Sequence, residues 1–172
     1  MEIERKYRVA QLPDNLEQCR HSDMEQAYLC TSPTIRVRKE WGRYVLTVKE
    51  RLPNASGGRP SQVAAIVNRE EEFALSEESY KKLRGKCEGM AVEKCRYRVP
   101  LEGGTLCAEL DIFKGRLEGL VMVEVEFGSE AEAEAFVPPA WFGVEVTADP
   151  RYRNSYLSTA RWDSATRGLL PL

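Results

Sequence analysis

The stretch Glu2-Ile3-Glu4-Arg5-Lys6-Tyr7 decides the fold expected for this chain. In a β-strand successive side chains point to opposite faces, so Glu2, Glu4 and Lys6 share one face. The period of two therefore predicts a strand with one formally charged face.

The same alternation recurs along the chain and predicts many β-strands. The segments are Met1–Val9, Thr34–Lys39, Arg43–Arg51, Val63–Leu75, Val92–Pro100, Thr105–Phe113 and Gly119–Phe127. Their polar faces repeatedly carry like charges two residues apart, as in Arg36 with Arg38 and Glu109 with Asp111. Charged residues are ordinary on solvent-facing strands, but like charges along one face are mildly unfavourable. Their recurrence indicates that they converge on a ligand inside a closed barrel, which has room for one at about eight strands.

Helices are expected to be few and to pack outside the barrel or close one end. Ser76-Glu77-Glu78 predicts the start of an amphipathic helix that reaches Cys87, and Ser129 with Glu132 predicts one that reaches Phe136. Weaker helical patterns cover Leu12–Cys19 and Ser155–Trp162. The breaker-rich stretch Pro53–Ser61 predicts a loop between strands. Together these features predict a single α+β domain over residues 1–172.

Composition narrows the class of protein. The 27 acidic and 25 basic residues leave a net charge of −2, which weighs against nucleic acid or an anionic membrane as partner. The five cysteines are odd in number and lack CxxC spacing, which argues against disulfides and a thiolate zinc site. A single histidine, His21, excludes a site built on paired histidines. With no apolar run as long as a membrane span, we expect a soluble cytoplasmic protein.

The charged strand faces supply two complementary sets of ligands. Carboxylates two residues apart, such as Glu124 with Glu126, can present oxygens to a hard cation such as Mg²⁺ or Mn²⁺. Side chains suited to phosphate oxygens form the opposite set: Arg36, Arg38, Lys49, Lys94 and Arg96. The motifs GxxxxGK[ST], GxGxxG, HExxH and GxSxG are absent. Phosphoryl transfer depends mainly on positioning and charge neutralisation, so this combination predicts a polyphosphate ligand.

In their order these motifs resemble those of the CYTH family, the triphosphate tunnel metalloenzymes. The family's amino-terminal ExExK is matched by Glu2, Glu4 and Lys6. Its later elements are similar to Gln26-Ala27-Tyr28-Leu29, Arg36-Val37-Arg38, Thr47-Val48-Lys49, Glu70 with Glu72, Lys94-Cys95-Arg96-Tyr97, Glu109-Leu110-Asp111, Glu124-Val125-Glu126, and Glu145-Val146-Thr147 through Asn154. ExExK alone has little specificity, but the ordered set spans nearly the whole chain.

The resemblance implies a closed antiparallel eight-stranded β-barrel, a tunnel that holds a divalent metal and a small-molecule triphosphate together. It implies metal ligands at Glu2, Glu4, Asp111, Glu124 and Glu126, and possible metal-binding or water-positioning roles for Glu70, Glu72 and Glu109. It implies phosphate binding by Lys6, Arg36, Arg38, Lys49, Lys94 and Arg96. Lys6 with Tyr28 resembles a pair that helps to activate the attacking water, and a carboxylate base is equally reasonable chemistry.

Two departures from the family pattern bear on this assignment. Glu70 and Glu72 are followed in phase by Ala74 instead of a third glutamate, and a one-residue slip would turn Arg69 and Glu71 inward in their place. The aromatic residue that commonly precedes the Glu109 strand is replaced by Cys107 or Ala108, which we expect to affect packing more than chemistry.

Three functions are compatible with the sequence. Hydrolysis of inorganic tripolyphosphate is favoured because no element for reading a base or sugar is evident. The same tunnel could instead act on a nucleoside, thiamine or RNA 5′-triphosphate, or cyclise ATP as class IV adenylate cyclases do. The third function is a non-catalytic polyphosphate-binding module. The pattern permits a homodimer without requiring one.

Overall fold

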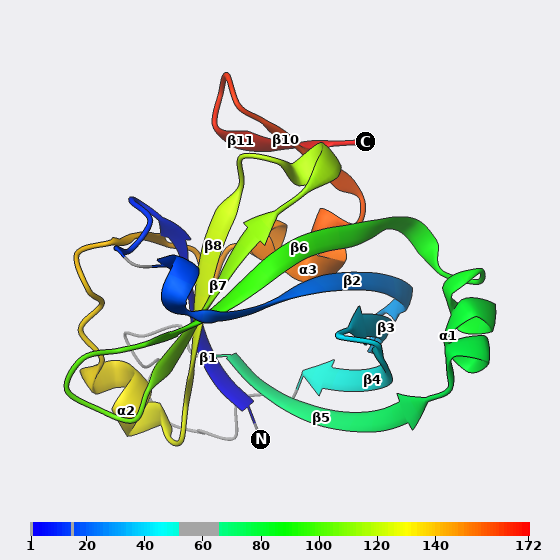
Figure 1. The fold of residues 1–172 in the computed structure, drawn as a ribbon, viewed down its shortest axis with the longest axis horizontal. Coiled ribbons are helices and arrows are strands. Elements are labelled where there is room, and N and C mark those ends of the chain that lie inside the picture. The colour runs from blue at the N-terminus through cyan, green and yellow to red at the C-terminus, as the bar shows by residue number, and fades with distance from the viewer. Residues whose placement is uncertain (1, 15, 52–65) are drawn as a thin grey trace.

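The computed structural model describes residues 2–14, 16–51 and 66–172 (Figure 1). The loop predicted over Pro53–Ser61 lies outside these residues. The described strands are β1 (Glu2–Val9), β2 (Arg20–Thr31), β3 (Thr34–Glu40), β4 (Arg43–Arg51), β5 (Ile66–Leu75), β6 (Glu88–Pro100), β7 (Cys107–Phe113), β8 (Val121–Phe127), β9 (Phe142–Glu145), β10 (Ala160–Asp163) and β11 (Gly168–Pro171). The helices are α1 (Glu77–Arg84), α2 (Glu130–Ala135) and α3 (Asn154–Leu157), with 3-10 turns η1 (Leu16–Gln18), η2 (Gly115–Leu117) and η3 (Pro150–Tyr152).

One antiparallel sheet dominates the molecule, in the order β5-β4-β3-β2-β6-β7-β8-β1-β9. β5 also pairs with β1, through Ile66–Asn68 against Glu2–Glu4, so the order of neighbours returns to its start. β10 and β11 form a separate two-stranded sheet, which lies at the top of Figure 1. The predicted α+β class and antiparallel sheet are confirmed.

The predicted number of eight strands was wrong for this sheet, which has nine. The reason lies in β1, one edge of which pairs first with the beginning of β5 and then with the short strand β9. Its first residues pair with β5, whereas Tyr7 and Val9 pair with Glu145 and Phe142 of β9. A strand of only four residues leaves too short a pattern to be recognised in the sequence.

β2 was absent from the alternating segments because its register is irregular. It pairs with β3 and β6, and each ladder shifts register near Tyr28. Such a bulge moves the following side chains out of the period of two.

The two stronger helix predictions are confirmed, with Ser76 and Ser129 as the amino-terminal caps of α1 and α2. Each cap hydroxyl accepts a hydrogen bond from a backbone N–H three residues on, at 3.1 Å. The two weaker predictions were largely wrong. Only a 3-10 turn is described within Leu12–Cys19, and α3 ends at Leu157, before β10 begins at Ala160. None of the described helices is long and apolar enough to cross a membrane.

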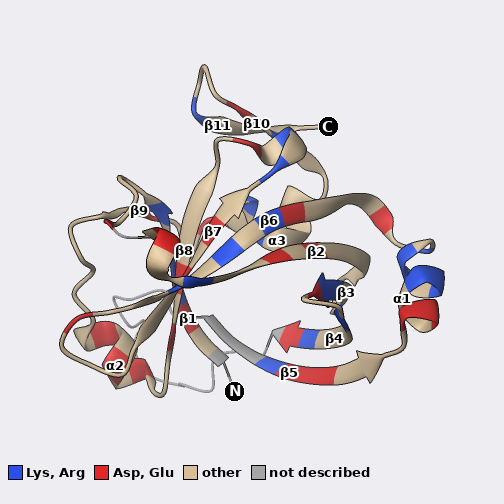
Figure 2. Ribbon diagram, viewed as in Figure 1, with Lys and Arg blue, Asp and Glu red and all other residues tan. Residues whose placement is uncertain are grey.

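Apolar side chains pack between the sheet and the elements outside it. Ala27 and Val37 pack with Tyr80 of α1, and Val125 packs in a cluster with Ala133 of α2. A third cluster joins the sheet to η2, α3 and β10. Charged residues of both signs lie along the same strands (Figure 2). The hydrophobic core therefore lies on one side of the sheet, and charged side chains from β1 and from β3 to β8 lie on the other, where they line a cavity.

Candidate active site

The polar faces line a cavity of about 800 Å³. All eight strands from β1 to β8 contribute to its wall, and most of the lining side chains are charged. The acidic ones are Glu4, Glu70, Glu72, Glu109, Glu124 and Glu126, and the basic ones are Lys6, Arg36, Arg38, Lys49, Lys94, Arg96 and Arg98. Such a wall can neutralise a highly charged anion and hold cations beside it.

Lys6 lies between two carboxylates of the wall. Its Nζ is 2.8 Å from Glu124 Oε1 and 3.3 Å from Glu4 Oε1. Burial opposes the charge of Lys6, but the attraction of Glu124 and Glu4 outweighs burial and raises the pKa of Lys6 above its ordinary value. Burial likewise opposes the charge of Glu124, but Lys6, together with Arg96 and Lys94, lowers the pKa of Glu124 well below its ordinary value. Both groups are therefore charged at neutral pH.

Asp111 holds two cations of β6 in place. Arg96 donates to it from Nε and Nη2, both at 2.7 Å, and Lys94 donates from Nζ at 2.5 Å. Asp111 and Lys94 are each 1% exposed. Both oxygens of Asp111 thus accept hydrogen bonds from cations, and the residue lies behind the cavity wall instead of on it.

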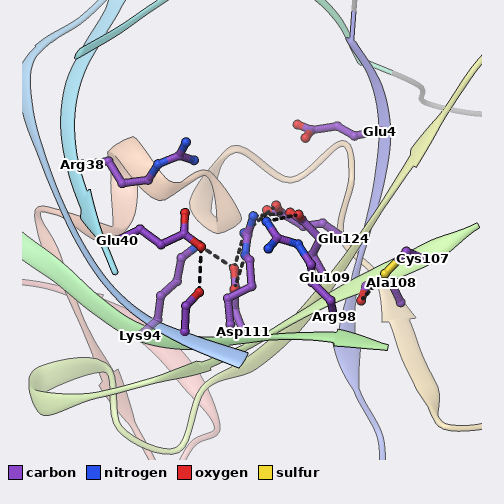
Figure 3. A network of polar contacts seen from close by, with 12 residues as sticks. Glu4, Arg38, Glu40, Lys94, Arg98, Cys107, Ala108, Glu109, Asp111 and Glu124 are labelled. Atoms are coloured by element: carbon purple, nitrogen blue, oxygen red, sulfur yellow. Dashed lines mark hydrogen bonds and ion pairs between the residues drawn. The ribbon is translucent and has the colours of Figure 1, made fainter. Parts of the chain in front are cut away.

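Arg96 connects Asp111 to the wall itself. It donates to Glu109 and, through Nη2 at 3.1 Å, to Glu124. Burial opposes the charge of Arg96, but these carboxylates raise its pKa well above the ordinary value. Figure 3 shows Asp111, Glu109 and Glu124 gathered on this side of the cavity.

The other side of the cavity pairs the cations of β3 and β4 with the carboxylates of β5. Arg36 Nη2 lies 3.4 Å from Glu70 Oε1, and Arg38 Nη2 lies 3.1 Å from Glu72 Oε1. Lys49 Nζ lies 3.4 Å from the second oxygen of Glu70. Glu70 and Glu72 therefore face the cavity, whereas Arg69 and Glu71 lie on the exposed face.

A further group of carboxylates in the cavity wall comes from the neighbouring strands β1 and β8. Glu4 and Glu126 are directly opposite each other in the ladder, and Glu4 extends toward the open centre of the cavity (Figure 3). Like charges in opposite positions repel, so a divalent cation between them would be stabilising. Within the described residues no three acidic, histidine or cysteine side chains converge as a metal cluster. Mg²⁺ commonly binds through one or two carboxylates, water and substrate phosphate, so the donors present fit such an ion.

Glu2 lies on the backbone of β1 two residues before Glu4, but its side chain falls outside what the structure describes. The metal-ligand role expected for Glu2 stays a prediction.

Tyr28 lines a second cavity, which adjoins the first. Its hydroxyl accepts a hydrogen bond from Gln26 Nε2 at 3.1 Å, and burial raises the pKa of Tyr28 to about 12. The phenol is therefore neutral at neutral pH.

The second cavity has a volume of about 250 Å³. It shares five lining residues with the first: Glu4, Lys6, Arg36, Lys49 and Asn154. Beyond them it is lined by Tyr28, the segment Thr31–Thr34, Thr147, Arg153 and Ser155. The two cavities thus meet at Lys6, Arg36 and Lys49.

The structure brings together most of the residues that the sequence analysis assigned to the site. The exceptions are Asp111, which lies behind the wall, and Glu2, whose side chain is outside what the structure describes. Four further residues were missed: Gln26, Arg98, Arg153 and Thr147, although the motifs of the resemblance spanned three of them. Arg98 continues the period of two from Lys94 and Arg96 and could have been found, whereas nothing local in the sequence places Arg153 beside β1.

Comparison with known proteins places the chain among phosphohydrolases. No family model matches it. It is 41% identical over 161 residues to the inorganic triphosphatase of Nitrosomonas europaea, covering 91% of this chain and 96% of that protein. It is 48% identical over 71 residues to the inorganic triphosphatase of Acetivibrio thermocellus, covering 41% of this chain and 43% of that protein.

Solved structures agree with this placement. A crystal structure of an inorganic triphosphatase is 37% identical, with a TM-score of 0.65 over 92% of this chain and 94% of that one. A Hippeastrum protein described as a candidate adenylyl cyclase with dominant triphosphatase activity has a TM-score of 0.58 over 78% of this chain and 83% of that one. At 16% identity the second likeness shows a shared fold alone. The identity to the Nitrosomonas europaea enzyme over nearly both whole chains shows that this chain belongs to the inorganic triphosphatases of the CYTH, or triphosphate tunnel metalloenzyme, family.

Proposed function

We propose that this protein hydrolyses inorganic tripolyphosphate with the help of Mg²⁺ or Mn²⁺, inside a tunnel enclosed by strands β1 to β8. The observation that carries the proposal is the cavity wall, whose described residues include seven cationic side chains and six carboxylates. The cations would neutralise a triphosphate, and the presence of carboxylates beside that anion is explained if a metal ion binds between them. The pairing of β5 with β1 and the junction of the two cavities support a tunnel.

The site's residues account for binding and for stabilisation of developing charge. Lys6, Arg36 and Lys49 lie where the two cavities meet, so we place the terminal phosphoryl group there. Arg96 and Lys94, held by Asp111, would bind the pyrophosphate part from the opposite wall. A bound metal ion would supply further neutralisation of the phosphate oxygens, with Glu4, Glu124 and Glu126 as its protein ligands.

In the reaction the oxygen of a water forms a bond to the terminal phosphorus. The bond from that phosphorus to the bridging oxygen breaks, and pyrophosphate leaves with its electron pair. The water's proton passes to a base. Tyr28, neutral because burial raises its pKa to about 12, is suited to orienting the water, and a carboxylate is the better proton acceptor.

The test is release of orthophosphate and pyrophosphate from tripolyphosphate, ATP, GTP and thiamine triphosphate, with Mg²⁺, with Mn²⁺ and with chelator. The wild type should prefer tripolyphosphate and need the metal. Glu4→Gln and Lys6→Ala should each lose about 100-fold or more in rate, as expected when one preorganised charged contact is removed. Lys114→Ala is the control and should keep its activity, because Lys114 pairs with the exposed Asp23 and does not line the cavity among the described residues.

Preference for another triphosphate would replace the substrate assignment. Tight tripolyphosphate binding without turnover of any compound would show a binding module and refute the proposed hydrolase.

A further inference from the structure

The second cavity differs from the first in its balance of charge. Among its described lining residues four are cationic, Lys6, Arg36, Lys49 and Arg153, and one is a carboxylate, Glu4. The first cavity has seven cations against six carboxylates. A metal–triphosphate complex suits the nearly balanced cavity, whereas an anion without a metal is favoured in the second.

Arg153 and Asn154 bring polar groups into the second cavity from the end of η3 and the start of α3. Both residues are half-buried. Their backbones are fixed, since Arg153 N–H donates to Pro150 and the Arg153 carbonyl accepts from Leu157. Neither side chain is held by another described residue, so a guanidinium and an amide are available to a ligand.

The occupant must be small, because the cavity measures about 250 Å³, less than a third of the first. The second cavity also adjoins the first at Lys6, Arg36 and Lys49, where the proposed function places the terminal phosphoryl group. Hydrolysis converts that group into orthophosphate and leaves pyrophosphate among the carboxylates and their metal. Orthophosphate therefore has the size, the charge and the starting position to enter the second cavity.

We propose that the second cavity is a binding site for the orthophosphate product, formed by Arg153 and Asn154. The proposal rests on the proposed triphosphatase function for the origin of the phosphate, although the site itself can be tested without turnover. It assigns the two products to opposite sides of the junction, with orthophosphate next to α3 and pyrophosphate in the larger cavity.

The experiment measures product inhibition of tripolyphosphate hydrolysis by orthophosphate and by pyrophosphate, in the wild type and in Arg153→Met. Removal of a charge-assisted hydrogen bond should raise the inhibition constant for orthophosphate by about tenfold or more. The constant for pyrophosphate should stay within about twofold. Arg153→Lys, which keeps a point charge, should restore part of the orthophosphate affinity, and Asn154→Ala should shift the same constant in the same direction.

Arg151→Met is the matched control, since Arg151 lies two residues away, is exposed and pairs only with Asp149 among the described residues. It should leave both constants unchanged. Unchanged orthophosphate inhibition in Arg153→Met, or an equal change for both products, would overturn the inference.

Calorimetric titration of orthophosphate separates this inference from the proposed function. If the wild type hydrolyses no triphosphate but binds orthophosphate more tightly than Arg153→Met does, the hydrolase proposal is refuted and the orthophosphate site is supported. If the wild type hydrolyses tripolyphosphate but Arg153→Met binds orthophosphate with unchanged affinity, only the proposed orthophosphate site is refuted.

Discussion

Replacing Asp111 with asparagine tests whether this buried carboxylate positions the cations of β6 or serves as a metal ligand. Asp111→Asn keeps the shape of the side chain and removes its charge. It leaves Lys94 and Arg96 without their shared counterion at positions that are 1% and 8% exposed. Removing one partner of a buried ion pair costs about 3–5 kcal/mol. For a chain of this length each kcal/mol lowers Tm by about 2–4 °C, so Tm should fall by about 6–20 °C.

Asp23→Asn is the control for this variant, because Asp23 makes a contact of similar length in a different environment. It lies 2.6 Å from Lys114, against 2.5 Å between Asp111 and Lys94, but its side chain is 75% exposed. An exposed pair contributes about 0–1 kcal/mol, which corresponds to a loss of about 0–4 °C. Differential scanning calorimetry of both variants makes the comparison.

Tripolyphosphate adds a second readout. Its negative charge can replace that of Asp111 beside Lys94 and Arg96, so a saturating amount without metal should stabilise Asp111→Asn by more than it stabilises the wild type. The metal concentration that half-activates the enzyme should stay unchanged, since Asp111 lies behind the wall. Equal losses of Tm in the Asp111 and Asp23 variants, or a large rise in the metal requirement, would refute the positioning role.

Two further predictions concern the packing of β9. Gly143→Ala would bring a Cβ within 2.6 Å of the Arg8 carbonyl oxygen, which cannot yield easily, so chemical denaturation should show a loss of about 1–3 kcal/mol. Gly85→Ala, whose nearest neighbours would be 3.6 Å away at a φ of −68°, should instead be neutral or gain up to about 1 kcal/mol, and a loss in both would contradict the steric argument. A hydrogen bond from Arg5 lowers the pKa of Glu145 in the folded state. Ionised Glu145 therefore stabilises the folded protein above the ordinary pKa of glutamate, and this contribution is lost as pH falls through the folded-state pKa. Urea titrations should therefore show Glu145→Gln less stable than the wild type at pH 7, with a difference that narrows below pH about 4; a difference independent of pH would exclude this linkage.

Much of the site could be predicted from the sequence because strand periodicity is a local property. Charges two residues apart must share a face, so Glu4 with Lys6 and Lys94 with Arg96 could be paired before their partners were known. The weaker predictions failed where tertiary contacts override local pattern. β2 was missed because a bulge near Tyr28 disturbs its period. The helix predicted over Ser155–Trp162 ends at Leu157, and the chain from Ala160 onward pairs with β11 instead.

The sequence by itself determined the antiparallel α+β class, the two sets of charges and which strands carry them, since each depends on spacing along one segment. Only the tertiary structure decided which acid meets which base. Asp111 became a buried partner of Lys94 and Arg96 because the register of β7 against β6 places it opposite Arg96. Arg153 lines the second cavity because the chain after β9 passes beside Lys6, where Val146 N–H donates to the Lys6 carbonyl. The Lys94–Asp111 contact depends on strand register, and the shared cavity of Lys6 and Arg153 depends on the return of the chain, and no local pattern encodes either.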